Sequence, residues 1–273
     1  MVFLELTEKL ARKVPRSFDF FQNYLIEYPI NYSLNNKYEK YVDGIKKLKD
    51  IHKGERCFLI GTGPSLNKTD FSLIQDEVLF GVNRLYEGFE RFNIRCRYMA
   101  LGDEQLFDDI YRHFLSLDSH LFICSKAGRH FLKKEGYYKS FIKSDFDVIR
   151  SLGHLQPGYS LDISKGIGGS ATIITESLQI IMYMGFKEVY LLGCDCDYSG
   201  VHQFHGGKNK HVEKDEKVDS YVSSMKPIYQ MFDAYKIIKK QFEDNNRYIY
   251  NSTVGGKLEV FERKGLDELE VGM

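Results

Sequence analysis

The sequence carries no excess of charge and no long apolar run. Its 38 Lys and Arg residues balance 38 Asp and Glu residues, so nucleic-acid binding would need a local basic patch. No apolar run approaches the ~18 residues of a membrane-spanning helix. Glu5, Glu8 and Lys9 interrupt the amino-terminal segment, which therefore does not read as a signal peptide. We expect a cytoplasmic protein with no transmembrane segment and no nucleic-acid partner.

Cysteine is also scarce. The five cysteines have no zinc-ligand spacing, and most of them lie in apolar runs: Cys57, Cys96, Cys124, Cys194 and Cys196. They are expected to be reduced thiols in the core, as is usual in a cytoplasmic protein.

The length of 273 residues suits one large α/β domain with an appendage. Residues 1–53 are predicted to form a helical amino-terminal extension, and residues 54–273 the main domain. The extension ends in a basic stretch, which fits a solvated face; the alternative is a partner or the inner face of the cell membrane. Its lysines are Lys46, Lys47, Lys49 and Lys53. Tyr-rich helices in the extension are compatible with a homo-oligomer.

Short apolar runs alternate with helical patterns along the main domain. Strands are expected at 57–60, 78–82, 98–101, 121–124, 189–192 and 248–250, and helices at 105–117 and 172–184. In the second helix, Ile174, Leu178 and Ile181 share one stripe, Ser170 or Thr172 can cap the start, and Gly185 ends it. This alternation predicts a mostly parallel sheet with helices on both faces, with ligands at the carboxyl ends of the strands.

The first such strand end is Gly61-Thr62-Gly63-Pro64-Ser65. No Gly-Lys-Ser/Thr follows, so it is not a Walker loop, and Leu66 replaces the third glycine of a dinucleotide fingerprint. The glycines let the backbone approach a phosphate, whereas Ser65 can cap the next helix. The alternative is a tight turn without a ligand.

Two further strand ends and a second glycine-rich loop add polar groups. Asn83 can contact a base or a ribose, and Asp103 either contacts a ligand or caps the next helix. In the loop "SKGIGGSAT", the backbone is freed by glycines and a helix begins, which favours a bound anion. The candidates in this loop are Lys165, Gly169, Ser170 and Thr172.

Acidic residues and histidines follow the strand at 189–192. Asp195 and Asp197 have the spacing with which a divalent ion is held against a diphosphate; otherwise Asp195 orders loops or contacts a sugar hydroxyl. His202 and His205 in the next loop are candidate general bases, because histidine titrates near neutrality. A zinc site or a plain surface loop is the alternative.

Several segments together resemble the MptE-like proteins (domain of unknown function 115), over about residues 50 to 267. They are "LIGTGPSL", "GVNR", "GFKEVYLLGCDCDY", the His-rich loop and "YIYNSTVGGKLEVFERKGLDEL". More distantly, they are similar to the bacterial CMP-sialic acid transferases of glycosyltransferase family 42. The resemblance implies a Rossmann-like fold, a variant of GT-A.

The resemblance also implies roles for individual residues. The loop from Gly61 to Ser65, Pro64 included, would face the phosphate and ribose of the donor, although Thr62 stands where the sialyltransferases have Asn. Asn83 would contact the nucleotide. The donor sugar would meet Asp103, Gln105 and Asp195. Tyr198 would steady the leaving phosphate, and His205, before His202, would be the base.

Two activities follow from the resemblance. The first is a glycosyltransferase of surface-polysaccharide or glycoconjugate biosynthesis, which moves a sugar from a CMP-linked nonulosonic acid to a glycan acceptor without a required cofactor. The alternative is a pyrophosphokinase that uses ATP and magnesium or manganese, held by Asp195 and Asp197. A non-catalytic module that binds sugar nucleotides is a third hypothesis.

Overall fold

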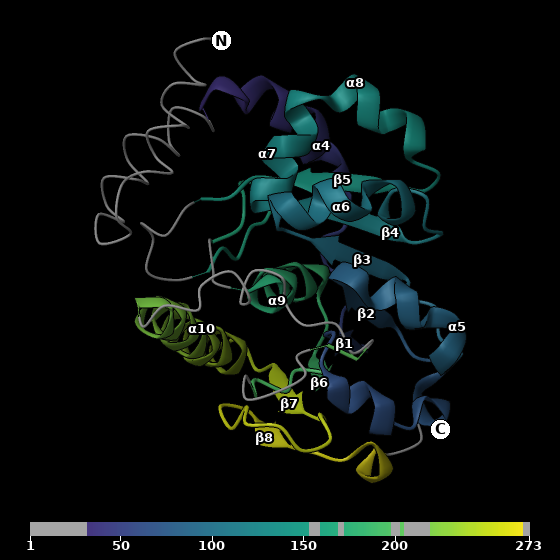
Figure 1. Ribbon diagram of the computed structural model, residues 1–273, viewed down its shortest axis with the longest axis vertical. Coiled ribbons are helices and arrows are strands. Elements are labelled where there is room, and N and C mark those ends of the chain that lie inside the picture. Colours follow the sequence, from purple (N-terminus) through teal and green to yellow (C-terminus); the bar gives the residue numbers. More distant parts are fainter. Residues whose placement is uncertain (1–31, 153–158, 169–171, 198–202, 205–218, 270–273) are drawn as a thin grey trace.

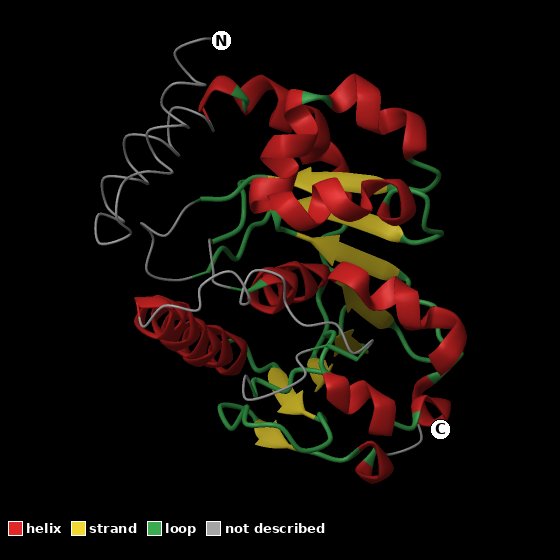
Figure 2. Ribbon diagram, in the orientation of Figure 1, coloured by secondary structure: helices red, strands yellow, loops and turns green. Residues whose placement is uncertain are grey.

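The computed structural model describes residues 32–152, 159–168, 172–197, 203–204 and 219–269, with only the backbone for 219–230. An eight-stranded parallel sheet forms the centre of this part of the chain (Figure 2). Its strands are β1 Arg56–Ile60, β2 Leu79–Val82, β3 Tyr98–Leu101, β4 His120–Cys124, β5 Phe146–Ile149, β6 Glu188–Leu192, β7 Tyr248–Asn251 and β8 Glu262–Arg263.

The strand order is β5-β4-β3-β2-β1-β6-β7-β8. The chain therefore builds outward from β1 to one edge, returns to pair β6 with the other side of β1, and continues to β8. Ile60 at the end of β1 is level with Leu192 at the end of β6. In doubly wound sheets, this reversal opens a crevice at the carboxyl ends of the two central strands, where ligands bind.

Helices cover both faces of the sheet. They are α4 Asn35–Lys47, α5 Phe89–Phe92, α6 Glu104–Phe114, α7 Ser125–Lys133, α8 Glu135–Tyr138, α9 Ile173–Met184 and α10 Asp219–Asp244. Short 3-10 helices add η3 Pro64–Lys68, η4 Phe71–Ile74, η5 Asn83–Gly88, η6 Lys139–Phe141 and η7 Leu266–Glu268. Figure 1 shows α9 and α10 together on one side of the central strands, with α5 on the other. Because both faces are covered, the central strands are apolar almost throughout.

The helix α9 confirms the clearest prediction from the sequence. Thr172 caps its start, with its Oγ1 accepting from the Ile174 N–H at 3.3 Å, and Gly185 ends it at φ +98°. The stripe of apolar residues nevertheless understates its burial. Every residue from Ile174 to Met184 is buried, because the helix lies between the sheet and α10.

The predicted strands are present, most of them one residue away from the expected limits. Two strands were missed. Asp147 interrupts the apolar run of β5, and its carboxylate is occupied by the His120 ring at 2.9 Å. β8 has only two residues, both exposed, so it leaves no apolar pattern in the sequence.

The helix α4 packs against the edge strand β5 and shares the main core. Tyr38, Tyr41 and Ile45 are buried there, and the Lys37 Nζ donates to the Leu132 carbonyl at 2.6 Å. The basic lysines that follow on this extension are exposed, as expected for a solvated face. A division of the chain at residue 54, a membrane contact and a homo-oligomer stay predictions.

All five cysteines are free thiols, and four of them are buried. Burial raises the pKa of the Cys57, Cys124 and Cys194 thiols well above the usual range. Neutral thiols are poor nucleophiles, so these residues serve packing. Among the described residues, no helix is both long enough and apolar enough to span a membrane.

Candidate functional site

The loops after β1 and β6 are joined backbone to backbone. Gly61 N–H donates to the Leu192 carbonyl at 2.8 Å, and Gly63 N–H donates to the Gly193 carbonyl at 2.9 Å. A Cβ at position 63 would lie 2.6 Å from the Gly193 oxygen and would overlap the Asp195 carboxylate. Glycine is therefore required at position 63 by the close approach of the two loops.

Asp195 completes this junction through Ser65. Its Oδ1 accepts from the Ser65 N–H at 3.1 Å, and its Oδ2 accepts from the Ser65 hydroxyl at 2.7 Å. The prediction that Ser65 caps the next helix is wrong: Gly63 is the N-cap of η3, and the Ser65 side chain donates to Asp195 in the loop after β6 instead. Asp195 thus orders the loops, one of the two roles foreseen for it outside metal binding.

Asp197 is engaged at the other side of the same loop. Its Oδ1 accepts from the Lys257 ammonium at 2.9 Å, while the Lys257 backbone N–H donates to the Asp195 carbonyl at 2.7 Å. A divalent ion held by both carboxylates would have to displace Ser65 from one and Lys257 from the other. No cluster of three His, Cys, Asp or Glu residues suited to a metal occurs among the described residues. Both carboxylates are thus engaged by donors of the protein, and metal dependence stays a prediction.

Asn83 follows β2 and starts η5 with a left-handed backbone at φ +53°. Its side-chain Oδ1 is buried and has no hydrogen-bond partner. Buried polar atoms are nearly always paired, so an unpaired acceptor at the ligand edge of the sheet needs a donor. A ribose hydroxyl or a base amine has the required chemistry.

Glu176 is a second buried polar group at this edge, and the sequence reading missed it. It lies in the first turn of α9, is 5% exposed, and burial raises its pKa to about 7. Its Oε1 accepts from the Ser125 hydroxyl at 2.8 Å, whereas Oε2 has no partner. The available signal was the single charged residue of the helix Ile173–Met184.

Phe204 is bonded to the β1 loop through its backbone. Its N–H donates to the Thr62 carbonyl at 2.8 Å, and its carbonyl accepts from the Asn67 side chain at 3.0 Å. The Phe204 ring is buried against Phe92, 5.4 Å between centroids. The chain one residue before His205 is thereby fixed to the loop expected to hold the phosphate.

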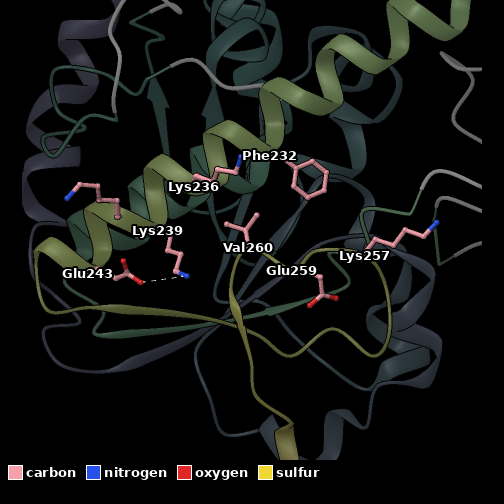
Figure 3. Close-up of a pocket in the computed structure, with 8 residues that line it drawn as sticks. Phe232, Lys236, Lys239, Glu243, Lys257, Glu259 and Val260 are labelled. Carbon is pink, nitrogen blue, oxygen red and sulfur yellow. Dashed lines mark ion pairs between the residues drawn. The ribbon is translucent and has the colours of Figure 1, made fainter.

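A groove lined by four lysines and two glutamates lies beside this region, between α10 and the segment that joins β7 to β8. Figure 3 shows its labelled side chains, among them Phe232 and Val260. The groove has a volume of about 470 Å³ and is lined by Phe232, Lys236, Lys239, Lys240, Glu243, Lys257, Glu259 and Val260. Through Lys257 it adjoins the β6 loop. We call it the lysine groove.

Comparison with known proteins assigns the chain to a family. Residues 31–201, more than half of the chain, match the family model described as "6-hydroxymethylpterin diphosphokinase MptE-like". The chain belongs to the MptE-like family. A search of curated proteins found no match for this MptE-like chain.

One solved structure agrees on the fold. The MAf glycosyltransferase from Magnetospirillum magneticum AMB-1 superposes with a TM-score of 0.51 at 13% identity, over 87% of this chain and 39% of that one. This MptE-like chain thus spans about two fifths of that enzyme. The sialyltransferase CstII from Campylobacter jejuni, with cytidine-5'-monophosphate, gives 0.37 at 12% identity, over 81% of this chain and 89% of that one. The predicted Rossmann-like α/β fold and the MptE-like family are confirmed; at 13% identity the first structure shows the fold alone.

The remaining site predictions have different outcomes in this MptE-like protein. The Asp103 carboxylate caps α6, accepting from the Leu106 N–H at 2.7 Å, and Gln105 is exposed. The Lys165 side chain is 79% exposed and pairs with Asp162 at 3.4 Å. Contacts of these residues with a donor stay predictions. The residues Gly169, Ser170, Tyr198, His202 and His205 lie outside the described part of the chain.

Proposed function

We propose that this MptE-like protein is a glycosyltransferase that binds a nucleotide-activated sugar at the carboxyl ends of β1, β2 and β6. The observation that carries the proposal is the junction of the β1 and β6 loops, where Gly63 is required by close approach and Ser65 is tied to Asp195. This junction lies at the reversal of strand order, where doubly wound sheets bind ligands. The unpaired Oδ1 of Asn83 belongs to the next strand and supplies an acceptor for the nucleoside.

The donor proposed is a CMP-linked nonulosonic acid. This choice rests on the resemblance of "LIGTGPSL", "GVNR" and "GFKEVYLLGCDCDY" to the CMP-sialic acid transferases. The β1 loop carries no phosphate-binding lysine, and the N–H groups of Gly61, Gly63 and Ser65 already donate to β6 and the loop after it. The amino terminus of α9 would therefore face the phosphate, because a helix start suits negative charge that develops on a departing group.

In the proposed reaction, His205 accepts the proton of an acceptor hydroxyl. The hydroxyl oxygen bonds to the anomeric carbon as the bond from that carbon to the phosphate oxygen breaks, and CMP leaves with the electron pair. The anchoring of Phe204 to Thr62 supports His205 over His202, because Phe204 is its direct neighbour in the chain. Tyr198 and Thr172 would contact the leaving phosphate.

The acceptor is proposed to be a glycan that carries anionic groups and lies in the lysine groove. Each of the four lysines there pairs with an acidic residue, so an anionic acceptor would replace these carboxylates as the partner of a lysine, and Phe232 supplies an aromatic face. Charge reversal at Lys236 and Lys239 should raise KM for an anionic acceptor and leave CMP affinity unchanged. The matched control reverses Lys46 and Lys47, which lie on α4. Equal effects of the two double variants on acceptor KM would refute this placement.

A thermal-shift panel tests the proposed function. CMP, CDP, UDP, GDP and ATP are each added with and without EDTA. A ligand at a hundred times its dissociation constant stabilises the folded state by about 2.7 kcal/mol. Stabilisation by CMP or CDP in EDTA supports the glycosyltransferase, and binding without turnover of any CMP-sugar would leave a non-catalytic module.

The second candidate is a diphosphokinase that uses ATP and magnesium, and the description of the family favours it. It requires Asp195 and Asp197 to exchange their bonds to Ser65 and Lys257 for metal. Stabilisation by ATP that EDTA abolishes, without an effect of CMP, would establish this candidate in place of the first.

A further inference from the structure

Glu176 is buried in a way that packing does not explain. The residue lies in a helix whose other buried side chains are mostly apolar, and only one of its two carboxyl oxygens has a partner. Burying a carboxyl group without full hydrogen bonding is costly, so such groups are usually retained for a reason other than stability.

The surroundings of Glu176 come from the ligand edge of the sheet. Gly102 follows β3, and a Cβ there would lie 2.8 Å from the Glu176 Oε2. Ser125 follows β4 with a left-handed backbone at φ +47° and donates its hydroxyl to Oε1. A non-glycine residue in that conformation carries strain, and in this conformation the Ser125 hydroxyl donates to the carboxyl group.

Asn83 adds a second unpaired acceptor one strand away. Val82 is level with Ala100 in the pairing of β2 with β3, so Asn83 and Gly102 stand on neighbouring strand ends. Adjacent strands are about 4.8 Å apart. The same edge of the sheet therefore has two buried oxygens without hydrogen-bond partners, the Asn83 Oδ1 after β2 and the Glu176 Oε2 beside the end of β3.

We propose that the Glu176 carboxylate, oriented by Ser125, accepts a hydrogen bond from a hydroxyl group of the bound nucleotide or of its sugar. This inference rests on the proposed function and names a specificity residue for it. A hydroxyl fits better than a phosphate, because an unpaired carboxylate oxygen attracts a donor and repels an anion.

The proposal makes binding depend on pH. Burial raises the pKa of Glu176 to about 7, and the hydrogen bond from Ser125 and the charge of Lys126 oppose that rise. The other titratable groups that sense its charge are Cys124 at the end of β4 and Tyr159 in the segment before α9. If only the ionised form accepts the hydroxyl, affinity should increase about tenfold from pH 6 to pH 8.

The test is isothermal titration of the full chain with CMP and with CMP-linked sialic acid at pH 6 and pH 8. Wild type is compared with Glu176→Gln, which keeps the shape and cannot ionise, and with Ser125→Ala. The control is Asp147→Asn, another buried acid that is paired with His120. The difference between wild type and Glu176→Gln cancels the titration of the ligand phosphate and of histidines.

At pH 8, Glu176→Gln should bind the ligand about ten- to a hundredfold more weakly than wild type does. It should also lose the increase in affinity that wild type shows between pH 6 and pH 8, whereas Asp147→Asn keeps that increase. If the affinity for CMP already increases from pH 6 to pH 8, the hydroxyl belongs to the ribose. If only the affinity for the CMP-sugar increases, the hydroxyl belongs to the sugar. If CMP binds and the pH profile of Glu176→Gln equals that of wild type for both ligands, the inference is overturned and the proposed function stands. If no nucleotide binds, both are overturned.

Discussion

The buried carboxyl group of Glu176 should make the stability of the ligand-free protein depend on pH. In the folded protein, the pKa of Glu176 is about 7, above the unperturbed value of 4.5 expected in the unfolded chain. The cause is burial, which disfavours the charged form. The stability associated with the neutral carboxyl is fully present below pH 4.5 and is lost as the pH rises through 7. A difference of 2.5 pKa units corresponds to about 3 kcal/mol, most of it lost between pH 5 and pH 7.

Glu176→Gln removes this titration and keeps the shape of the side chain. Denaturant unfolding at pH 5, 6, 7 and 8 measures the free energy of unfolding of both proteins. The substitution itself changes the free energy of unfolding by a pH-independent amount, so the two proteins are compared by how their free energies of unfolding change with pH. From pH 5 to pH 8, the free energy of unfolding of Glu176→Gln should rise by about 2–3 kcal/mol relative to that of wild type. Parallel curves over that range would show that Glu176 does not titrate near neutrality, and the reasoning from its burial would be refuted.

Three further predictions concern the phosphate loop and the base. Gly63→Ala should destabilise the fold by about 2–4 kcal/mol and abolish CMP binding, because its Cβ would overlap the Asp195 carboxylate; a normal melting temperature would contradict this. Ser65→Ala leaves Asp195 without a hydroxyl donor and should cost about 1–3 kcal/mol in denaturant unfolding, whereas an unchanged midpoint would contradict the junction. His205→Ala should lower kcat about 10²–10⁴-fold with unchanged CMP affinity, and His211→Ala serves as the control; equal turnover of His205→Ala and wild type would remove His205 from the mechanism.

The fold was largely predictable because its signals are local. Apolar runs such as Phe58–Ile60 belong to strands buried on both faces, and Thr172 and Gly185 delimit α9 by capping chemistry that the sequence displays. The strand β5 escaped because Asp147 satisfies its charge with His120 on another strand. Such compensation depends on tertiary structure and leaves no local pattern.

The place of the candidate site stays a prediction, and its contacts left no signal in the sequence. The carboxyl ends of the strands follow from the alternation of strands and helices, and the glycines of the β1 loop are close to the β6 loop as a site there requires. The partner of Ser65 was not predictable, because Asp195 is 130 positions away in the chain. Glu176 was missed for the same reason: its surroundings include Gly102, directly after β3, and Ser125, directly after β4, which are both distant in the sequence.

The central claim is that the junction of the β1 and β6 loops binds a cytidine nucleotide without a metal ion. Isothermal titration of CMP into wild-type protein in EDTA tests it directly, with Asn83→Ala as the variant that lacks the nucleoside contact. The account predicts saturable binding to wild type and about ten- to a hundredfold weaker binding to Asn83→Ala, given the loss of one or two hydrogen bonds. No heat of binding in EDTA, together with binding of ATP once magnesium is restored, would contradict it.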